Sequence, residues 1–146
     1  MDTVPDQKIC RVLTSRRAKT DTASPKLLIV DDSVDSLEAL VELLSIEGYE
    51  CETAADGIEA IEQASRVLPD LVVMDISMPR LNGVEAAQRL RANAETEPIP
   101  MLAYTALDEN DVRAKMQDHE FDVYCRKGTN IDSLFWLIDQ LPVKRD

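Results

Sequence analysis

Residues 71–83, LVVMDISMPRLNG, place the carboxylate of Asp75 directly after four apolar residues. An apolar run of this length is typical of a strand that is buried on both faces of a sheet. A carboxylate at the end of such a strand is costly to bury unless hydrogen-bond donors or a cation pair with it. Met78-Pro79 and Gly83 then predict a sharp turn. We therefore expect Asp75 to end a buried strand and to face a charged partner.

Short apolar runs like this one alternate with helical periods along most of the chain. Alternating strands and helices predict a parallel sheet with right-handed crossovers and helices on both faces. With five strands in 146 residues, we expect a flavodoxin-like, doubly wound α/β fold with strand order 2-1-3-4-5. The expected strands cover residues 26–31, 49–54, 71–75, 100–106 and 121–127, and the expected helices cover residues 37–44, 58–68, 84–91, 108–119 and 131–141.

Three segments follow from this pattern. Residues 1–25 form a weakly basic N-terminal extension that could be flexible; Ile9, Val12 and Leu13 have the spacing of one docked helical turn. Residues 26–142 form the α/β domain, and residues 143–146 form a C-terminal tail. We expect no output domain after the last helix.

The charge distribution argues against direct binding to nucleic acids. The net charge is −12, and residues 1–25 carry five basic and three acidic side chains. The remaining residues carry 11 basic and 25 acidic side chains, a net of −14. Such a surface repels DNA and RNA phosphates.

The compartment is indicated by the cysteines and the apolar runs. Cys10, Cys51 and Cys125 are odd in number and widely spaced, which favours reduced thiols in a cytoplasmic protein over a disulfide framework or a zinc site. No apolar run approaches the ~20 residues of a membrane span, and the N-terminus lacks the apolar region of a signal peptide.

The expected strand order brings three carboxylates together. Sites in open parallel sheets form outside the carboxyl ends of the strands, where the strand order reverses. Here that point lies between the first and third strands, which end at Asp31-Asp32 and at Asp75. Two adjacent aspartates also occur as simple helix caps. Three clustered carboxylates, however, repel one another, and Mg²⁺ with oxygen ligands removes that conflict. We therefore expect a magnesium site.

Two further strand ends contribute polar groups to the same edge. Thr105 follows the fourth apolar run and Lys127 ends the fifth. Both would face Asp75 from the side opposite to Asp31 and Asp32. A hydroxyl and an ammonium group suit the binding of a phosphoryl group on Asp75.

Four motifs in this order resemble response-regulator receiver domains of two-component signalling. They are IVDDS at 29–33, VVMDISMPRLNG at 72–83, AYTA at 103–106 and YCRK at 124–127, and the resemblance covers about residues 26–142. It implies a stand-alone receiver that is phosphorylated by a sensor histidine kinase or a histidine phosphotransfer protein. Such a domain catalyses its own phosphorylation and dephosphorylation, without turnover of an external substrate, and acts on a downstream protein.

The resemblance also implies roles for single residues. Asp75 would be the phosphoacceptor, a carboxylate nucleophile that attacks phosphohistidine. Asp32 would bind Mg²⁺ directly, Asp31 largely through water, and Ser77 through its backbone carbonyl.

The remaining roles concern the response to the phosphoryl group. Thr105 and Lys127 would bind it, and Tyr124 would be an aromatic switch that turns inward once Thr105 moves. Receiver domains usually carry a proline after the lysine, often after a cis bond, but this chain has Gly128 there. Because a non-proline cis bond costs roughly 2.5–4 kcal/mol, we expect a trans Lys127–Gly128 bond or a looser loop.

Alternative functions remain at this point. A phosphatase with an aspartyl-phosphate intermediate typically has Asp-x-Asp, whereas this chain has Ser77 two residues after Asp75. A receiver-like interaction module that works without phosphorylation is the main alternative. A phosphotransfer module would be all helical, and we expect its candidate, His119, to be a surface residue. Trp136 lies off the apolar stripe of the last helix and is a candidate partner or homodimer contact.

Overall fold

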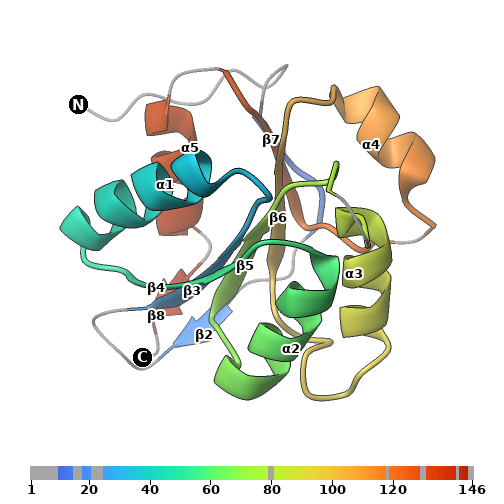
Figure 1. Ribbon diagram of the computed structural model, residues 1–146, viewed down its shortest axis with the longest axis horizontal. Helices are drawn as coiled ribbons and strands as arrows, with labels where there is room; N and C mark the ends of the chain where they lie inside the picture. The colour runs from blue at the N-terminus through green and yellow to red at the C-terminus, as the bar shows by residue number, and fades with distance from the viewer. Residues whose placement is uncertain are drawn as a thin grey trace.

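The computed structural model describes residues 10–14, 18–20, 25–78, 81–117, 119–128, 131–140 and 142–144. A six-stranded sheet in the order β1-β7-β6-β5-β3-β4 forms its centre, with helices on both faces (Figure 1). The strands are β1 Cys10–Val12, β3 Lys26–Val30, β4 Glu50–Ala54, β5 Leu71–Met74, β6 Met101–Thr105 and β7 Val123–Arg126. The helices are α1 Val34–Ile46, α2 Gly57–Val67, α3 Gly83–Arg91, α4 Glu109–Lys115 and α5 Ile131–Gln140.

The expected α/β fold is confirmed. The five strands from β3 to β7 pair in parallel throughout. Their spatial order β4-β3-β5-β6-β7 is the order 2-1-3-4-5 that the sequence predicts. β4, which contains the most polar residues of the five, lies at the sheet edge.

The N-terminal extension differs from the expected helical turn. Cys10–Val12 form β1, which pairs antiparallel with the outer edge of β7. Ile9, the first residue of the expected turn, lies outside the described residues. The edge of β7 offers unpaired backbone groups, and pairing with β1 satisfies part of that edge. A second, two-stranded parallel sheet joins β2, Ala18–Thr20, to β8, Pro142–Lys144, which includes part of the expected C-terminal tail.

Side-chain caps set the starts of four helices. Ser33, Asp56, Asn82 and Asp108 each accept a hydrogen bond from the backbone N–H three residues later. Such caps satisfy donors that the first helical turn leaves unpaired. α4 ends at Lys115, before the expected end at residue 119, because Met116 adopts an extended conformation.

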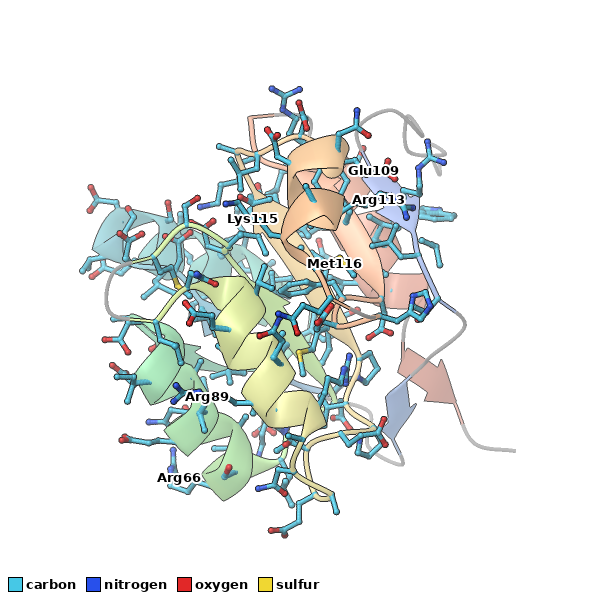
Figure 2. The ribbon with its side chains drawn as sticks, turned by 90° about the vertical axis from the view of Figure 1, so that its right-hand side faces the viewer. Arg66, Arg89, Glu109, Arg113, Lys115 and Met116 are labelled. Carbon is cyan, nitrogen blue, oxygen red and sulfur yellow. The ribbon has the colours of Figure 1, made fainter. Side chains whose placement is uncertain are left out.

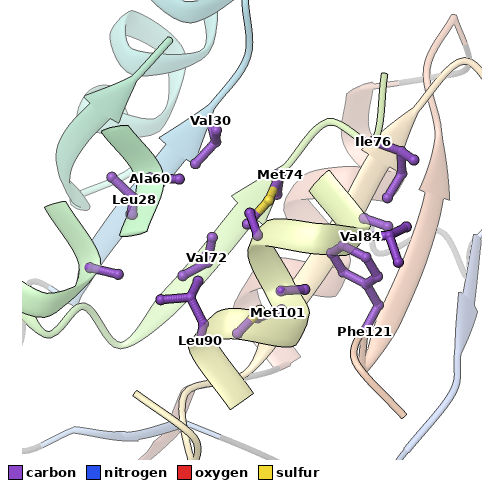
Figure 3. Packing of buried hydrophobic residues seen from close by; sticks show 14 of the residues in the cluster. Leu28, Val30, Ala60, Val72, Met74, Ile76, Val84, Leu90, Met101 and Phe121 are labelled. Carbon is purple, nitrogen blue, oxygen red and sulfur yellow. The ribbon is translucent and has the colours of Figure 1, made fainter. Parts of the chain in front are cut away.

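The core consists of two layers, one on each face of the sheet. Residues of α2 and α3 pack with Val72 and Met74 on one face (Figure 3), and Val112 of α4 belongs to the same cluster. Residues of α1 and α5 pack with Leu71 and Val73 on the other. All four β5 side chains are at most 1% exposed, so β5 is buried on both faces as its sequence predicts.

A buried ion pair joins α3 to the start of β7, at the end of the sheet opposite the carboxyl ends of the strands. The guanidinium of Arg91 donates to the Asp122 carboxylate at 2.8 Å and to the backbone carbonyls of Glu97, Ile99 and Glu120. The carboxylate also accepts from the Met101 backbone N–H at 2.8 Å. Asp122 is 0% exposed, so this pairing offsets the cost of burying its charge.

Removing the guanidinium tests this role. We expect Arg91→Ala to lower the free energy of unfolding by about 3–5 kcal/mol, because a buried carboxylate loses its charged partner. Urea denaturation followed by circular dichroism measures it. Arg66→Ala is the matched control: Arg66 pairs with Glu52 at the surface, at 3.3 Å with 63% of its side chain exposed, and its loss should cost at most about 1 kcal/mol. Equal losses in the two variants would contradict the structural role of Arg91.

Candidate functional site

Asp75 follows β5 at the carboxyl edge of the sheet, and the chain turns back immediately after it. The Asp75 N–H donates to the Val30 carbonyl at 2.9 Å, which ties it to β3. The Gly83 N–H donates to the Ile76 carbonyl at 2.9 Å. A Cβ atom on Gly83 would lie 2.2 Å from the Asp75 carbonyl oxygen. The sharp turn that the sequence predicts therefore requires glycine at position 83.

Three carboxylates meet at this edge. Asp31 and Asp32 follow β3, the neighbour of β5, and one carboxylate oxygen from each of Asp31, Asp32 and Asp75 lies within 4.8 Å of the other two. Asp31 is 2% exposed and Asp75 is 8% exposed, whereas Asp32 is exposed. The structure thus brings together the three aspartates that the sequence singles out.

The ammonium group of Lys127 lies between two of these carboxylates. Its Nζ donates to Asp31 Oδ2 at 2.5 Å and to Asp75 Oδ2 at 3.1 Å. It also lies 5.8 Å from the centroid of the Tyr104 ring. Burial alone would lower the pKa of Lys127, but its hydrogen bond to Asp31 and the charge of Asp75 together raise that pKa above the ordinary 10.5. Lys127 therefore stays charged at neutral pH.

Backbone donors fix the other carboxylate oxygens. The Ser33 N–H donates to Asp31 Oδ1 at 2.9 Å, and the Ser77 N–H donates to Asp75 Oδ1 at 3.3 Å. These bonds orient both carboxylates towards the edge of the sheet. Carboxylate and carbonyl oxygens are the ligands that Mg²⁺ prefers, so the donor set at this edge fits that ion.

A cleft opens in front of the carboxylates. Asp32 and Ser77 line it together with Ile76, Met78, Asn82 and Lys115. Figure 2 shows Lys115 at the end of α4, on the side that faces the loop after β5. The sequence did not single out Asn82 or Lys115. Glu85, three residues after Asn82, signals a helix cap there; no local signal connects Lys115 to the cleft.

Thr105 and Tyr124 lie on the two strands beyond β5. Thr105, at the end of β6, is 1% exposed, and its Oγ1 accepts from the Leu107 N–H at 3.3 Å. Tyr124, in β7, is also 1% exposed and its hydroxyl donates to the Leu107 carbonyl at 2.6 Å. Burial raises the pKa of Tyr124 to about 12. The ring of Tyr124 thus points inward in this structure.

The Lys127–Gly128 bond is trans, since no described residue follows a cis peptide bond. Gly128 has a φ of +84°. Proline is fixed near −65° and cannot adopt this conformation. Glycine at this position therefore gives the turn after β7 a backbone path that the usual proline would forbid.

Two other candidates lie apart from the carboxylates. His119 is exposed near the start of β7, as a surface residue would be. Trp136 is half-buried and packs against the core layer under α1 and α5. Part of its apolar surface therefore stabilises the core.

A family model described as "Response regulator receiver domain" matches residues 27–139. The chain belongs to this family. The matched residues run from within β3 to within α5, and they include every aspartate of the cluster and Lys127.

The receiver domain also resembles individual proteins. It is 38% identical over 109 residues to the response regulator MprA of Mycobacterium leprae, covering 75% of this chain and 47% of that protein. The chain thus spans about half the length of the curated relatives it matches. Among solved structures, chemotaxis protein CheY4 of Vibrio cholerae has a TM-score of 0.75 at 28% identity and covers 82% of this chain and 99% of its own.

A second solved structure bears on the metal. Response regulator TrrA of Thermotoga maritima, in complex with Mg²⁺ and BeF, has a TM-score of 0.72 at 32% identity. The match covers 80% of this chain and 98% of that one.

In this receiver, none of the described helices combines the length and apolar composition needed to span a bilayer.

The ion pairs of Lys127 predict that this side chain stabilises the fold at neutral pH but not at strongly alkaline pH. With EDTA at neutral pH, we expect Lys127→Met to lose about 2 kcal/mol of unfolding free energy, because Asp31 and Asp75 lose a charged donor. The pKa of Lys127 is raised on folding, so this stabilisation is complete below 10.5 and disappears as the pH rises through the folded-state value. Urea denaturation of both proteins across this range measures the difference.

Lys115→Met is the control, because Lys115 is an exposed lysine at the same cleft. It should match the wild type in urea at every pH. A difference between wild type and Lys127→Met that persists unchanged at alkaline pH would show that the ion pairs do not cause it.

Proposed function

We propose that this receiver accepts a phosphoryl group on Asp75 from the phosphohistidine of a sensor histidine kinase or a histidine phosphotransfer protein, and then signals through protein–protein contacts. The observation that supports the proposal is the placement of Lys127 against Asp75 beside two further carboxylates. A carboxylate oxygen of Asp75 attacks phosphorus as the P–N bond to histidine breaks. The electron pair of that bond stays on the imidazole nitrogen, which takes up a proton.

The residues that would hold Mg²⁺ differ in their surroundings. Asp32 is exposed at the cleft, which suits direct ligation. Asp31 is 2% exposed and both of its oxygens accept hydrogen bonds, which suits ligation through water. The carboxylate of Asp75 would complete the set, since one of its oxygens lies within 4.8 Å of an oxygen of each of the other two aspartates. Ser77 lines the same cleft and would offer its backbone carbonyl. When bound, the ion offsets negative charge on the transferring phosphoryl group.

Two side chains of this receiver, Lys127 and Thr105, would bind the phosphoryl group once it is on Asp75. Phosphorylation gives Asp75 a charge of up to about −2 and three acceptor oxygens. Lys127 already lies within hydrogen-bond distance of Asp75 and would pair with the new group. Thr105 would donate its hydroxyl, which draws the loop at Leu107 towards the site. Because the hydroxyl of Tyr124 donates to the Leu107 carbonyl, the ring would follow this movement.

This receiver would act as a switch rather than as an enzyme with an external substrate. Asp75 is both acceptor and product, and hydrolysis of its phosphoryl group returns the starting state. We place the protein in the cytoplasm, with Cys51 and Cys125 as thiols. The exposed part of Trp136 on α5 is our candidate for a homodimer or partner contact.

Incubation with acetyl phosphate and Mg²⁺ tests the proposal directly. Intact-protein mass spectrometry should show a gain of one phosphoryl group in the wild type and none in Asp75→Asn, which lacks the nucleophile. Asp32→Asn should react roughly 100-fold more slowly, because it loses a charge that positions the ion. EDTA should abolish the gain in every protein.

Asp70→Asn is the matched control, because Asp70 lies at the opposite end of β5, where its carboxylate accepts from the Lys26 N–H. It should be phosphorylated at the wild-type rate. An unmodified wild type would favour an interaction module that works without phosphorylation, and an equal mass gain in Asp75→Asn would place the phosphoryl group elsewhere.

A further inference from the structure

Arg11 lies directly across from the switch tyrosine. In the antiparallel pair of β1 and β7, Arg11 is the partner of Tyr124, between the pairs Cys10–Cys125 and Val12–Val123. Residues opposite one another in such a pair project from the same face of the sheet. Tyr124 packs on the face covered by α3 and α4. The side chain of Arg11 therefore leaves the sheet on that face as well.

An ion pair to α4 confirms this direction. Arg11 Nε lies 2.7 Å from Glu109 Oε1 at the start of α4. Arg113 Nε binds the other oxygen of the same carboxylate at 2.6 Å. Figure 2 shows β1, in blue, passing beside Glu109 and Arg113. Arg11 thus bridges the gap between the outer edge of the sheet and α4.

The segment that carries Arg11 is anchored at its other end. The Leu13 and Thr14 N–H groups donate to the Asp122 carbonyl at 2.7 and 3.2 Å. The Thr14 hydroxyl donates to the Asp122 carboxylate, which Arg91 also holds. We call residues 10–14 the N-terminal strap. It runs along β7 from Cys125 to Asp122 and covers the strand that contains Tyr124.

This geometry closes the outward path of the Tyr124 ring. The ring is inside, 1% exposed, with its hydroxyl on the Leu107 carbonyl. A ring that turned outward between the β7 edge and α4 would meet the Arg11–Glu109 pair and the backbone of β1.

We propose that Arg11 is a positioning residue for Tyr124: the N-terminal strap, tied to α4 by Arg11 and Glu109, holds the ring inward. If the proposed function holds, this contact also favours phosphorylation of the receiver. The inward ring is the arrangement that a phosphoryl group on Asp75 would favour, and anything that populates it beforehand raises the fraction of competent chains. By the same linkage, phosphorylation strengthens the binding of the strap.

The position of the ring can be measured without any phosphodonor. The full chain labelled with 3-fluorotyrosine gives ¹⁹F signals from Tyr49, Tyr104 and Tyr124, and Tyr124→Phe identifies the last of these. We expect Arg11→Ala to raise the solvent-exposed population of the Tyr124 signal by roughly two- to fivefold, as the loss of one partly exposed ion pair allows. Arg11→Lys keeps the charge and should restore most of the inward population.

Arg113→Ala is the matched control, because it removes the other arginine on Glu109 and leaves the strap in place. Its Tyr124 signal should match the wild type. An unchanged signal in Arg11→Ala, or the same change in Arg113→Ala, would overturn the proposal. Arg11 is an exposed side chain, and urea denaturation confirms that each variant is folded.

The second readout is the rate of phosphorylation by acetyl phosphate. Arg11→Ala should react more slowly by a factor similar to its loss of inward population, and Arg11→Lys should react at nearly the wild-type rate. A rate that fails to follow the inward population measured from the Tyr124 signal would overturn the coupling to Asp75. If the wild type itself is not phosphorylated, the proposed function fails, while the ¹⁹F measurement still decides whether Arg11 positions the ring.

Discussion

The ammonium group of Lys127 between the carboxylates of Asp31 and Asp75 is the interaction on which the site depends. It joins β7 to β3 and β5, so three strand ends are held by one charge. Without a cation, Asp31 and Asp75 would repel each other in an almost buried position. The pKa of Lys127 is raised for the same reason: both carboxylates stabilise its charged form by more than burial destabilises it. The carboxyl edge of the sheet is therefore a structural junction as well as the site that we propose for the phosphoryl group.

The parts of this junction that the sequence predicted depend on topology. Once alternating strands and helices indicate the order 2-1-3-4-5, Asp31, Asp32 and Asp75 must lie at adjacent strand ends. The contact between Lys127 and Asp75 follows in the same way. The contact between Lys127 and Asp31 was not predicted, because strand order places a backbone but does not choose among nearby carboxylates.

The parts that the sequence did not predict depend on pairs far apart in the chain. β1 has three residues and no period, and it forms because β7 offers an open edge. Asp122 lies in an apolar strand segment where a carboxylate is unexpected, and its partner Arg91 comes from α3. Lys115 reaches the cleft only through the placement of α4. Local patterns describe the elements, whereas these contacts require the assembled fold.

The strand order also bears on how copies of this protein behave together. An open sheet has two edges at which another chain could add a strand, and such edges favour aggregation. β1 lies outside β7, so on that side the sheet ends in a strand of only three residues, which offers few backbone groups to a neighbour. β4 forms the other edge, and its sequence ECETA places Glu50 and Glu52 there. Two copies approaching through β4 would bring like charges together, which keeps this edge from pairing with itself.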